Sequence, residues 1–427
     1  MIATTKEMKP HLRRQYIHIV LLFGLISLCG DIVYEGARGI VPPYLVLLGA
    51  TALVIGIVGG LGDFIGYSLR FITGRQADAT HRYWTFVFLG YGLTFLVVPL
   101  LGVTRALWLA VILLILERLG KAIRTPSRDV LLSAVSKEIG RGKAFGVAEA
   151  LDQIGAFLGP LFVAAALVFW SSDVDNPNVD DYVLPFGILL LPGILALMIL
   201  LLTYDLYPKT TELTVAKTKY SNTAPSTSLS SIPQHIWLYS LTMATSVFGL
   251  FGAFFILYRA GEIPSMPSYW IPLLYLFAMA VDAIFALIFG VVYDRCGIPL
   301  IAISFIFVAL IPIVALSKTV PTMILAAAFF GIVMGIQESI VRAAVADLSE
   351  VETRGLSYGL FYLFYGVAFL SGGILIGLIY ELGMLWIVGL ALVTQVVALL
   401  FLGLTQRSFL KATADDSGDL TANDNIN

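Results

Sequence analysis

The chain carries acids and bases inside its longest apolar stretches, where ionisable side chains are costly. At the centre of a bilayer each carboxylate costs on the order of 2.5–3.5 kcal/mol by insertion scales, so each is expected to face a cavity or a charged partner. An acid that lacks a basic partner in such a low-dielectric site is favoured to hold a proton near neutral pH. These residues are therefore the candidates for proton coupling or ligand binding: Asp31, Glu35, Arg38, Asp63, Arg70, Glu117, Arg118, Glu149, Asp152, Asp282 and Glu338.

Spacing groups several of these acids on common helix faces. Asp31 and Glu35 are four positions apart, and so share one face of a helix. Glu149 and Asp152 are three apart and share a face as well. Arg70 and Arg118, even with Arg38 at the outer end of the first span, are too few to neutralise eight acids. At least one acid is therefore predicted to bind a coupling proton, and the candidates for that role are Asp31, Glu35, Asp63, Glu149 and Asp152.

Structural ion pairs are the alternative for some of these residues. Arg118 could neutralise Glu117 or Glu149. Arg70, seven positions from Asp63 and on the same helix face, could neutralise that acid. The acid-rich interior favours a cationic or amphipathic ligand, although coupling protons would explain the same acids. Four aromatic residues near the acids either line a cavity or simply pack, and they are Tyr34, Tyr67, Tyr275 and Tyr365.

The elements that position these residues are predicted to be membrane-spanning helices. Hydrophobic residues make up 59% of the chain, charged residues 13%, and the mean hydropathy is +0.91, whereas soluble domains carry about 25% charge. The apolar runs are continuous and do not alternate with period two, which excludes a β-barrel. Windows of about 20 residues give twelve spans, near 17–36, 44–72, 83–103, 106–124, 143–170, 182–203, 234–258, 268–292, 299–317, 321–346, 354–380 and 383–405.

The distribution of Lys and Arg predicts the orientation. With a cytosolic N-terminus, 20 of the 26 basic residues fall on the cytosolic side, including Lys121, Arg124 and Arg128, and two lie within spans. The four on the opposite side are Arg38, Arg105, Arg259 and Lys318. The positive-inside rule therefore predicts that both termini are cytosolic. No cleavable signal peptide is expected, because Lys6, Lys9, Arg13 and Arg14 lead directly into a full-length span.

Two short patterns occur twice at almost the same offset. Gly74-x-x-x-Asp78 returns 216 positions later as Gly290-x-x-x-Asp294, and Arg141-Gly142 returns 213 positions later as Arg354-Gly355. A shift of half the chain length indicates a duplicated unit, and two copied bundles can expose one central site to either side in turn. The predicted divisions are a cytosolic N-terminus (1–16), a six-helix bundle (17–203), a cytosolic linker (204–233), a second six-helix bundle (234–405) and a disordered cytosolic tail (406–427).

The repeated Gly-x-x-x-Asp segments resemble the signature of the major facilitator superfamily, Gly-x-x-x-Asp-(Arg/Lys)-x-Gly-(Arg/Lys)-(Arg/Lys). The first copy has Ala79 and His81 where the family prefers a base and a glycine, and the second matches through Gly297 and then loses the basic pair. The resemblance implies an all-α protein of twelve spans in two bundles related by pseudo-two-fold symmetry. It also implies a cytosolic gate made by Gly74, Asp78, Arg82, Arg141, Gly290, Asp294, Arg295 and Arg354. The simpler alternative is a polar turn at a helix end.

The span at 143–170 carries a second family pattern. Its glycines and proline follow the spacing that proton-coupled exporters of the superfamily show, with Val163 and Ala164 in place of the last two glycines. Ordinary close packing between helices is the alternative, because small residues serve that purpose in membranes. The residues concerned are Gly146, Gly155, Gly159 and Pro160. The segment 117–129 resembles the loop between spans 4 and 5 of uncharacterised bacterial permeases in the same superfamily.

Together these features predict a secondary transporter that works by alternating access in a bacterial cytoplasmic membrane. Proton-coupled export is the expected mode, with a proton-coupled uptake symporter as the alternative and a polytopic enzyme or a channel further behind. The sequence has no Gly-x-x-x-x-Gly-Lys-(Ser/Thr) element and no His/Cys cluster, so no ATP-driven pump, metal or other cofactor is expected. The expected partners are a small-molecule substrate, protons and the bilayer, without nucleic acid, and the protein is expected to be a monomer.

Overall fold

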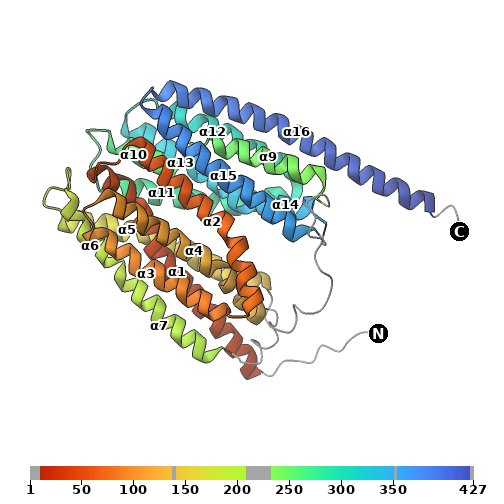
Figure 1. Ribbon diagram of the computed structural model, residues 1–427, viewed down its shortest axis with the longest axis horizontal. Coiled ribbons are helices and arrows are strands. Elements are labelled where there is room, and N and C mark those ends of the chain that lie inside the picture. The colour runs from red at the N-terminus through yellow and green to blue at the C-terminus, as the bar shows by residue number, and fades with distance from the viewer. Residues whose placement is uncertain (1–9, 137–140, 208–231, 351–352, 424–427) are drawn as a thin grey trace. The chain divides into compact units, whose positions relative to one another are not determined.

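A computed structural model describes residues 10–136, 141–207, 232–350 and 353–423, and in these ranges the chain is helical without a strand (Figure 1). The first half contains α1 (Pro10–Leu47), α2 (Ala52–Thr80), α3 (Tyr83–Val103), α4 (Leu107–Ser136), α5 (Arg141–Trp170), η1 (Val179–Tyr182), α6 (Val183–Ile188) and α7 (Leu190–Leu206). The second half contains α9 (Gln234–Phe248), α10 (Ala253–Gly261), α11 (Trp270–Cys296), η3 (Ile298–Ile301), α12 (Ala302–Val314), α13 (Val320–Ile336), η4 (Gln337–Val341), α14 (Arg342–Leu348), α15 (Arg354–Tyr380) and α16 (Met384–Asn423).

Ten of the helical segments in the described ranges are long and apolar enough to cross a membrane. The two other predicted spans are present as helices. α4 has the length but carries six charged residues between Glu117 and Asp129, and the segment Ile298–Val314 is apolar but short. The protein is therefore a multi-pass helical membrane protein, and the count of twelve spans stays a prediction.

Two segments differ from what the sequence predicts. Residues 117–129 form the middle of α4 and not a loop after a span that ends at 124. Their Glu, Arg, Leu, Lys and Ala residues favour helix, and their charges find partners inside the protein. The predicted disordered tail is helical in α16 up to Asn423, because adding residues to an existing helix avoids the cost of nucleating one.

Packing divides the chain into two compact units. The first comprises residues 1–44, 69–223 and 268–276, and the second comprises residues 45–68, 224–267 and 277–427. The boundaries of the predicted bundles, 17–203 and 234–405, stay predictions, and the predicted linker 204–233 lies mostly outside the described residues.

Glycines set the closest helix contacts of the first unit. A Cβ at Gly159 of α5 would lie 2.5 Å from the Ile32 carbonyl oxygen and 2.7 Å from the Gly36 nitrogen of α1. Gly155 of α5 meets the backbone of Leu28 in the same way. Gly146 has nothing within 4 Å of its would-be Cβ. Two of the three glycines in this pattern therefore serve the α1–α5 contact.

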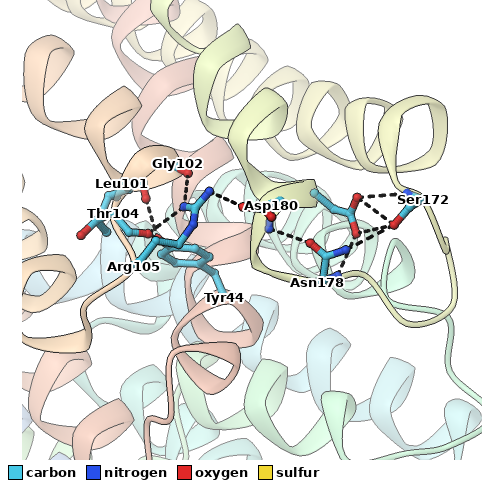
Figure 2. Close-up of polar contacts among 9 residues, drawn as sticks. Tyr44, Leu101, Gly102, Thr104, Arg105, Ser172, Asn178 and Asp180 are labelled. Atoms are coloured by element: carbon cyan, nitrogen blue, oxygen red, sulfur yellow. Dashed lines mark hydrogen bonds and ion pairs between the residues drawn. The ribbon is translucent and has the colours of Figure 1, made fainter.

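A polar network ties the end of α1 to two connecting segments in the first unit (Figure 2). The buried Tyr44 hydroxyl donates to the carbonyl oxygens of Leu101 and Thr104, at 2.5 and 2.8 Å. Arg105 donates to the Gly102 and Thr104 carbonyls and forms an ion pair of 2.5 Å with Asp180. This network holds the end of α1 against the segments that follow α3 and α5. α1 carries several of the predicted site residues, including Asp31 and Glu35.

We expect Gly159→Ala to lower the free energy of unfolding by about 1–3 kcal/mol, because the added methyl group overpacks a backbone contact. Gly146→Ala is the matched control on the same helix, and it should raise stability by up to about 1 kcal/mol through helix propensity. Thermal unfolding of the full-length protein in detergent measures both. Equal melting temperatures for the two variants would contradict the assigned α1–α5 contact.

Candidate functional site

One face of α1 carries the polar residues of the candidate site. Ser27, Asp31, Tyr34, Glu35 and Arg38 follow each other at intervals that place them within about 100° of the helix circumference. Tyr34 and Glu35 are buried, whereas Asp31 and Arg38 are half-buried. This face of α1 therefore carries mixed charge, with two acids and one base around an aromatic ring.

One face of α4 carries the opposing charges. Glu117, Arg118, Lys121, Arg124 and Arg128 are spaced one, three, three and four positions apart, which keeps all five on one side of the helix. Glu117, Arg118 and Arg124 are buried, and Arg124 is only 3% exposed. α4 is brought close to α3 by another glycine contact, since a Cβ at Gly90 would lie 2.5 Å from the Gly120 carbonyl oxygen.

Tyr34 is the point where the two faces meet. The Lys121 ammonium lies 3.4 Å from the centroid of its ring and the Arg118 guanidinium 4.6 Å from it. The Arg38 guanidinium lies 5.8 Å from the same centroid. Cations placed over an aromatic face are attracted by its quadrupole, and more strongly where water is excluded. The ring therefore holds three cations near one another without neutralising any of them.

Glu35 has two partners from different parts of the chain. The Tyr275 hydroxyl of α11 donates to Glu35 Oε2 at 2.5 Å, and Lys121 Nζ lies 4.0 Å from Glu35 Oε1. Tyr275 belongs to the part of α11 that packs within the first unit. Arg118 Nε lies 3.3 Å from Glu117 Oε2. Of the predicted structural pairs, the one between Arg118 and Glu117 is thus present.

Arg124 has no acid at ion-pairing distance among the residues that the structure describes. Its Nη1 donates to the Thr94 hydroxyl at 2.8 Å, and its guanidinium lies 4.5 Å from the centroid of the Tyr91 ring. Arg128 differs, because it donates to the Ser27 hydroxyl at 2.7 Å and pairs with Asp129 at 3.0 Å. Arg124 is therefore a buried cation whose direct contacts are neutral.

Asp31 of α1 and Asp152 of α5 are like charges that interact electrostatically. Asp31 also interacts with Lys121, Glu35 and Arg124. Asp152 Oδ1 is buried and has no hydrogen-bond partner within the described part of the chain. When both are charged, two carboxylates placed near each other in a site of low dielectric repel each other.

The structure brings most of the predicted site residues of the first unit together and separates the others. Arg70 of α2 joins the cluster through its charge interaction with Lys121. Glu149 lies exposed on α5. Three predicted residues belong to the second unit, and they are Asp63 in α2, Asp282 in α11 and Glu338 in η4.

The second unit has an aromatic and amide cluster of its own. The π-helical turn η4 begins at Gln337, whose side-chain oxygen accepts a 2.8 Å hydrogen bond from the Tyr365 hydroxyl. Tyr67 packs edge-on against Tyr365 at 5.2 Å and stacks on Tyr362 at 5.7 Å. Asp63 interacts electrostatically with Tyr365. π-Helical turns often occur at functional sites. This cluster is therefore a second candidate for a ligand-binding site.

The predicted gate residues make contacts within their own units. Asp78 accepts a 3.0 Å hydrogen bond from the Tyr83 hydroxyl, and Gly74 approaches Pro126. Arg354 donates to the Ser349 hydroxyl and to the Ala346 and Ser349 carbonyls. Among the other predicted gate residues, Arg82, Asp294 and Arg295 are exposed and Gly290 is half-buried in α11. The Arg141 side chain lies outside the described residues. Their role as a gate stays a prediction.

Sequence reasoning missed three basic residues of the site. Lys121, Arg124 and Arg128 were assigned to the cytosolic side, but α4 places them on its inward charged face. Removing these three from the twenty leaves seventeen on that side against four, so the predicted orientation is unchanged. The successive steps of three, three and four residues from Arg118 through Lys121 and Arg124 to Arg128 were the available signal for a common helix face.

Comparisons with known proteins agree on one family. A model of the Major Facilitator Superfamily matches residues 23–297 and 269–419. An uncharacterised protein of Mycobacterium tuberculosis is 38% identical over 385 residues, which cover 90% of this chain and 92% of that protein. An uncharacterised MFS-type transporter of Methanocaldococcus jannaschii is 27% identical over 372 residues, which cover 85% of this chain and 88% of that protein.

Among solved structures, the crystal structure of the nucleoside transporter NupG matches with a TM-score of 0.67, covering 92% of this chain and 99% of that chain. The sequence identity is 12%. At this identity the likeness shows a common fold and carries nothing about the substrate.

We expect Tyr275→Phe to lower the free energy of unfolding by about 1.5–3 kcal/mol, because it removes a hydrogen bond to a buried carboxylate. Tyr269→Phe is the matched control in the same stretch of chain, since no hydrogen bond of its hydroxyl is seen in the described residues. Thermal unfolding in detergent reports the difference. A Tyr275→Phe variant as stable as Tyr269→Phe would show that the bond to Glu35 does not form.

Proposed function

Because the chain belongs to the major facilitator superfamily, we propose that it is a proton-coupled secondary transporter. It takes up a small molecule together with protons across a bacterial cytoplasmic membrane. Transporters of this kind alternate the exposure of a site near the bilayer midplane. The membrane-embedded charged cluster of α1, α4 and α5 is the proposed site.

The observation that carries this proposal is the interaction of the carboxylates of Asp31 and Asp152 beside two cations, Lys121 and Arg124, that lack a close ion pair in the described residues. Asp31 interacts with Lys121 and Arg124 as well as with Asp152. When the pair takes up a proton, it loses one negative charge and the surrounding cations lose part of their balance. A proton on the pair therefore makes the cluster more positive at the place where a cargo would bind.

Coupling follows if the two transport states differ in their affinity for that proton. A ligand shifts a conformational equilibrium only by its difference in affinity for the two states. Asp31 and Asp152 stand on α1 and α5, which touch through Gly155 and Gly159. Repulsion between the two carboxylates acts across this contact when both are charged, and a shared proton relieves it. The proton thus changes the energy of the α1–α5 contact directly.

Export by antiport is the second candidate. It is favoured by the glycine and proline spacing of α5, which resembles that of proton-coupled exporters. In the structure, Gly155 and Gly159 pack against the backbone of α1, and ordinary close packing explains that contact as well. The charge arrangement favours uptake for an anionic cargo, because a proton that makes the cluster more positive then binds together with the cargo.

We expect Asp31→Asn and Asp152→Asn to abolish accumulation driven by a pH gradient while each retains exchange of cargo between the two sides of a vesicle. The amide stands in for a protonated carboxyl, so the carrier would cycle without needing protons. Asp205→Asn is the control, because Asp205 is exposed at the end of α7. Purified protein in liposomes, with a cargo found by thermal stabilisation, gives both measurements. Full gradient-driven accumulation in both variants would contradict the proposal.

The direction of flux separates the two candidates in the same liposomes. Uptake predicts that an inward proton gradient drives cargo inward. Outward movement of cargo against an inward proton flow would establish antiport instead. Enzymatic turnover without any gradient-driven flux would overturn both.

A further inference from the structure

We propose that the transported molecule is an anion, and that Lys121 and Arg124 of α4 bind its carboxylate or phosphate group. The inference deepens the proposed function and rests on it, because it names the substrate class of the same site. It also departs from the cationic or amphipathic ligand that the acids alone favour.

The surroundings of Lys121 and Arg124 leave room for an anion. Both cations interact electrostatically with Asp31, and the one acid at ion-pairing distance from either in the described residues is Glu35, 4.0 Å from Lys121. The neighbouring Tyr34 and Tyr91 present their ring faces to the two cations. Arg128 is different, because it pairs with Asp129 and also interacts with Asp152. Protonation of Asp31 would leave Lys121 and Arg124 with less compensating negative charge.

Arg124 is the strongest single argument. It is 3% exposed, and a buried charge is tolerated only where hydrogen bonds or other charges replace the water it has lost. Of its five N–H donors, only Nη1 has an acceptor among the described residues, and this acceptor is the neutral Thr94 hydroxyl. The planar guanidinium has donors left for the two oxygens of a carboxylate or phosphate, and such paired contacts are the strong ones.

Lys121 supplies the second contact. Its side chain is 23% exposed, and its ion pair with Glu35 is the longest in the described residues, at 4.0 Å. The other oxygen of Glu35 is held by Tyr275. Lys121 lies one helical turn from Arg124 on the same face of α4, so the two cations can reach one anionic group. Arg118 is committed to Glu117 and is assigned to the electrostatic background.

Binding of the anion in this arrangement is linked to the proton. A charged carboxylate of Asp31 or Asp152 competes with the anion for Lys121 and Arg124. Protonation removes the negative charge of that carboxylate, so the anion should bind more tightly as pH falls. This linkage is reciprocal and is what a symporter of protons with an anion requires.

The test measures thermal stabilisation of the purified full-length protein in detergent, without any gradient. The probes are inorganic phosphate, succinate and phenyl phosphate, with benzylamine and benzyl alcohol as cationic and neutral counterparts and sodium chloride at equal ionic strength as the reference. We expect at least one of the three anions to raise the melting temperature by several degrees, and more at low pH than at high pH. Anions that act no better than chloride, or stabilisation by benzylamine alone, would overturn the inference.

Variants locate the effect. Lys121→Gln and Arg124→Gln should each weaken the stabilising anion at least tenfold, and Arg124→Lys should restore part of the affinity. Arg407→Gln, in the exposed part of α16, should leave it unchanged. Since Arg124→Gln also loses contacts to α3, Lys121→Gln keeps the test decisive if that variant is unstable. Equal affinity in Lys121→Gln, Arg124→Lys and the wild type would overturn the assignment, as would stabilisation that phosphatidylglycerol produces and none of the soluble anions does.

The outcome separates this inference from the proposed function. Gradient-driven transport of an amine would leave the proposed function standing and overturn the anion site. Anion binding at Lys121 and Arg124 without proton-driven flux in liposomes would leave the anion site standing and overturn the proposed function.

Discussion

The constraint on which the first unit depends is the cost of keeping charges inside a membrane. A buried ion is tolerated only where other charges or hydrogen bonds replace the water it has lost. α1 and α4 meet this condition by facing each other with acids and bases on both helices, joined at Tyr34. The Tyr34 ring attracts the cations through its quadrupole, but it is neutral and leaves their positive charge unbalanced. The pairs Arg118–Glu117 and Arg128–Asp129 are closed. Arg124 has no acid at ion-pairing distance in the described residues, and this is the basis for proposing that the site binds an anion.

Close helix packing makes this balance sensitive to conformation. The α1–α5 contact passes through Gly155 and Gly159, and the α3–α4 contact passes through Gly90 and Gly120. Backbones in direct contact leave little room for side chains to compensate for a shift of one helix. Movement of α5 relative to α1 would therefore change the distance between Asp31 and Asp152 directly, and with it the cost of having both charged. A single proton can in this way bias a helix arrangement without a large rearrangement of side chains.

Sequence reasoning recovered the helical membrane architecture because long apolar runs and their period are local properties. It also singled out Asp31, Glu35 and Asp152, since an ionisable residue inside an apolar window is visible from its neighbours, and their role as a site stays a prediction. It misjudged the bases, because hydropathy ended the fourth span at 124 and assigned the polar residues around it to a loop. In the structure α4 continues to Ser136. The change from an acid-rich to a mixed site follows from that single boundary.

Other parts of the site could not be read from the sequence in physical terms. Tyr275 and Glu35 are 240 positions apart, and no local pattern fixes a tertiary hydrogen bond. Asp31 and Asp152 each looked like one member of a separate pair on its own helix, with Glu35 and Glu149. In the structure Asp31 instead interacts electrostatically with Asp152, and Glu149 lies exposed. Spacing along one helix tells which residues share a face, but only the packing of α1 against α5 decides which faces meet. Two acids on different helices can be separated by helix movement, whereas two acids on one helix cannot, and this distinction is what makes the Asp31–Asp152 pair suited to couple a proton to a change of state.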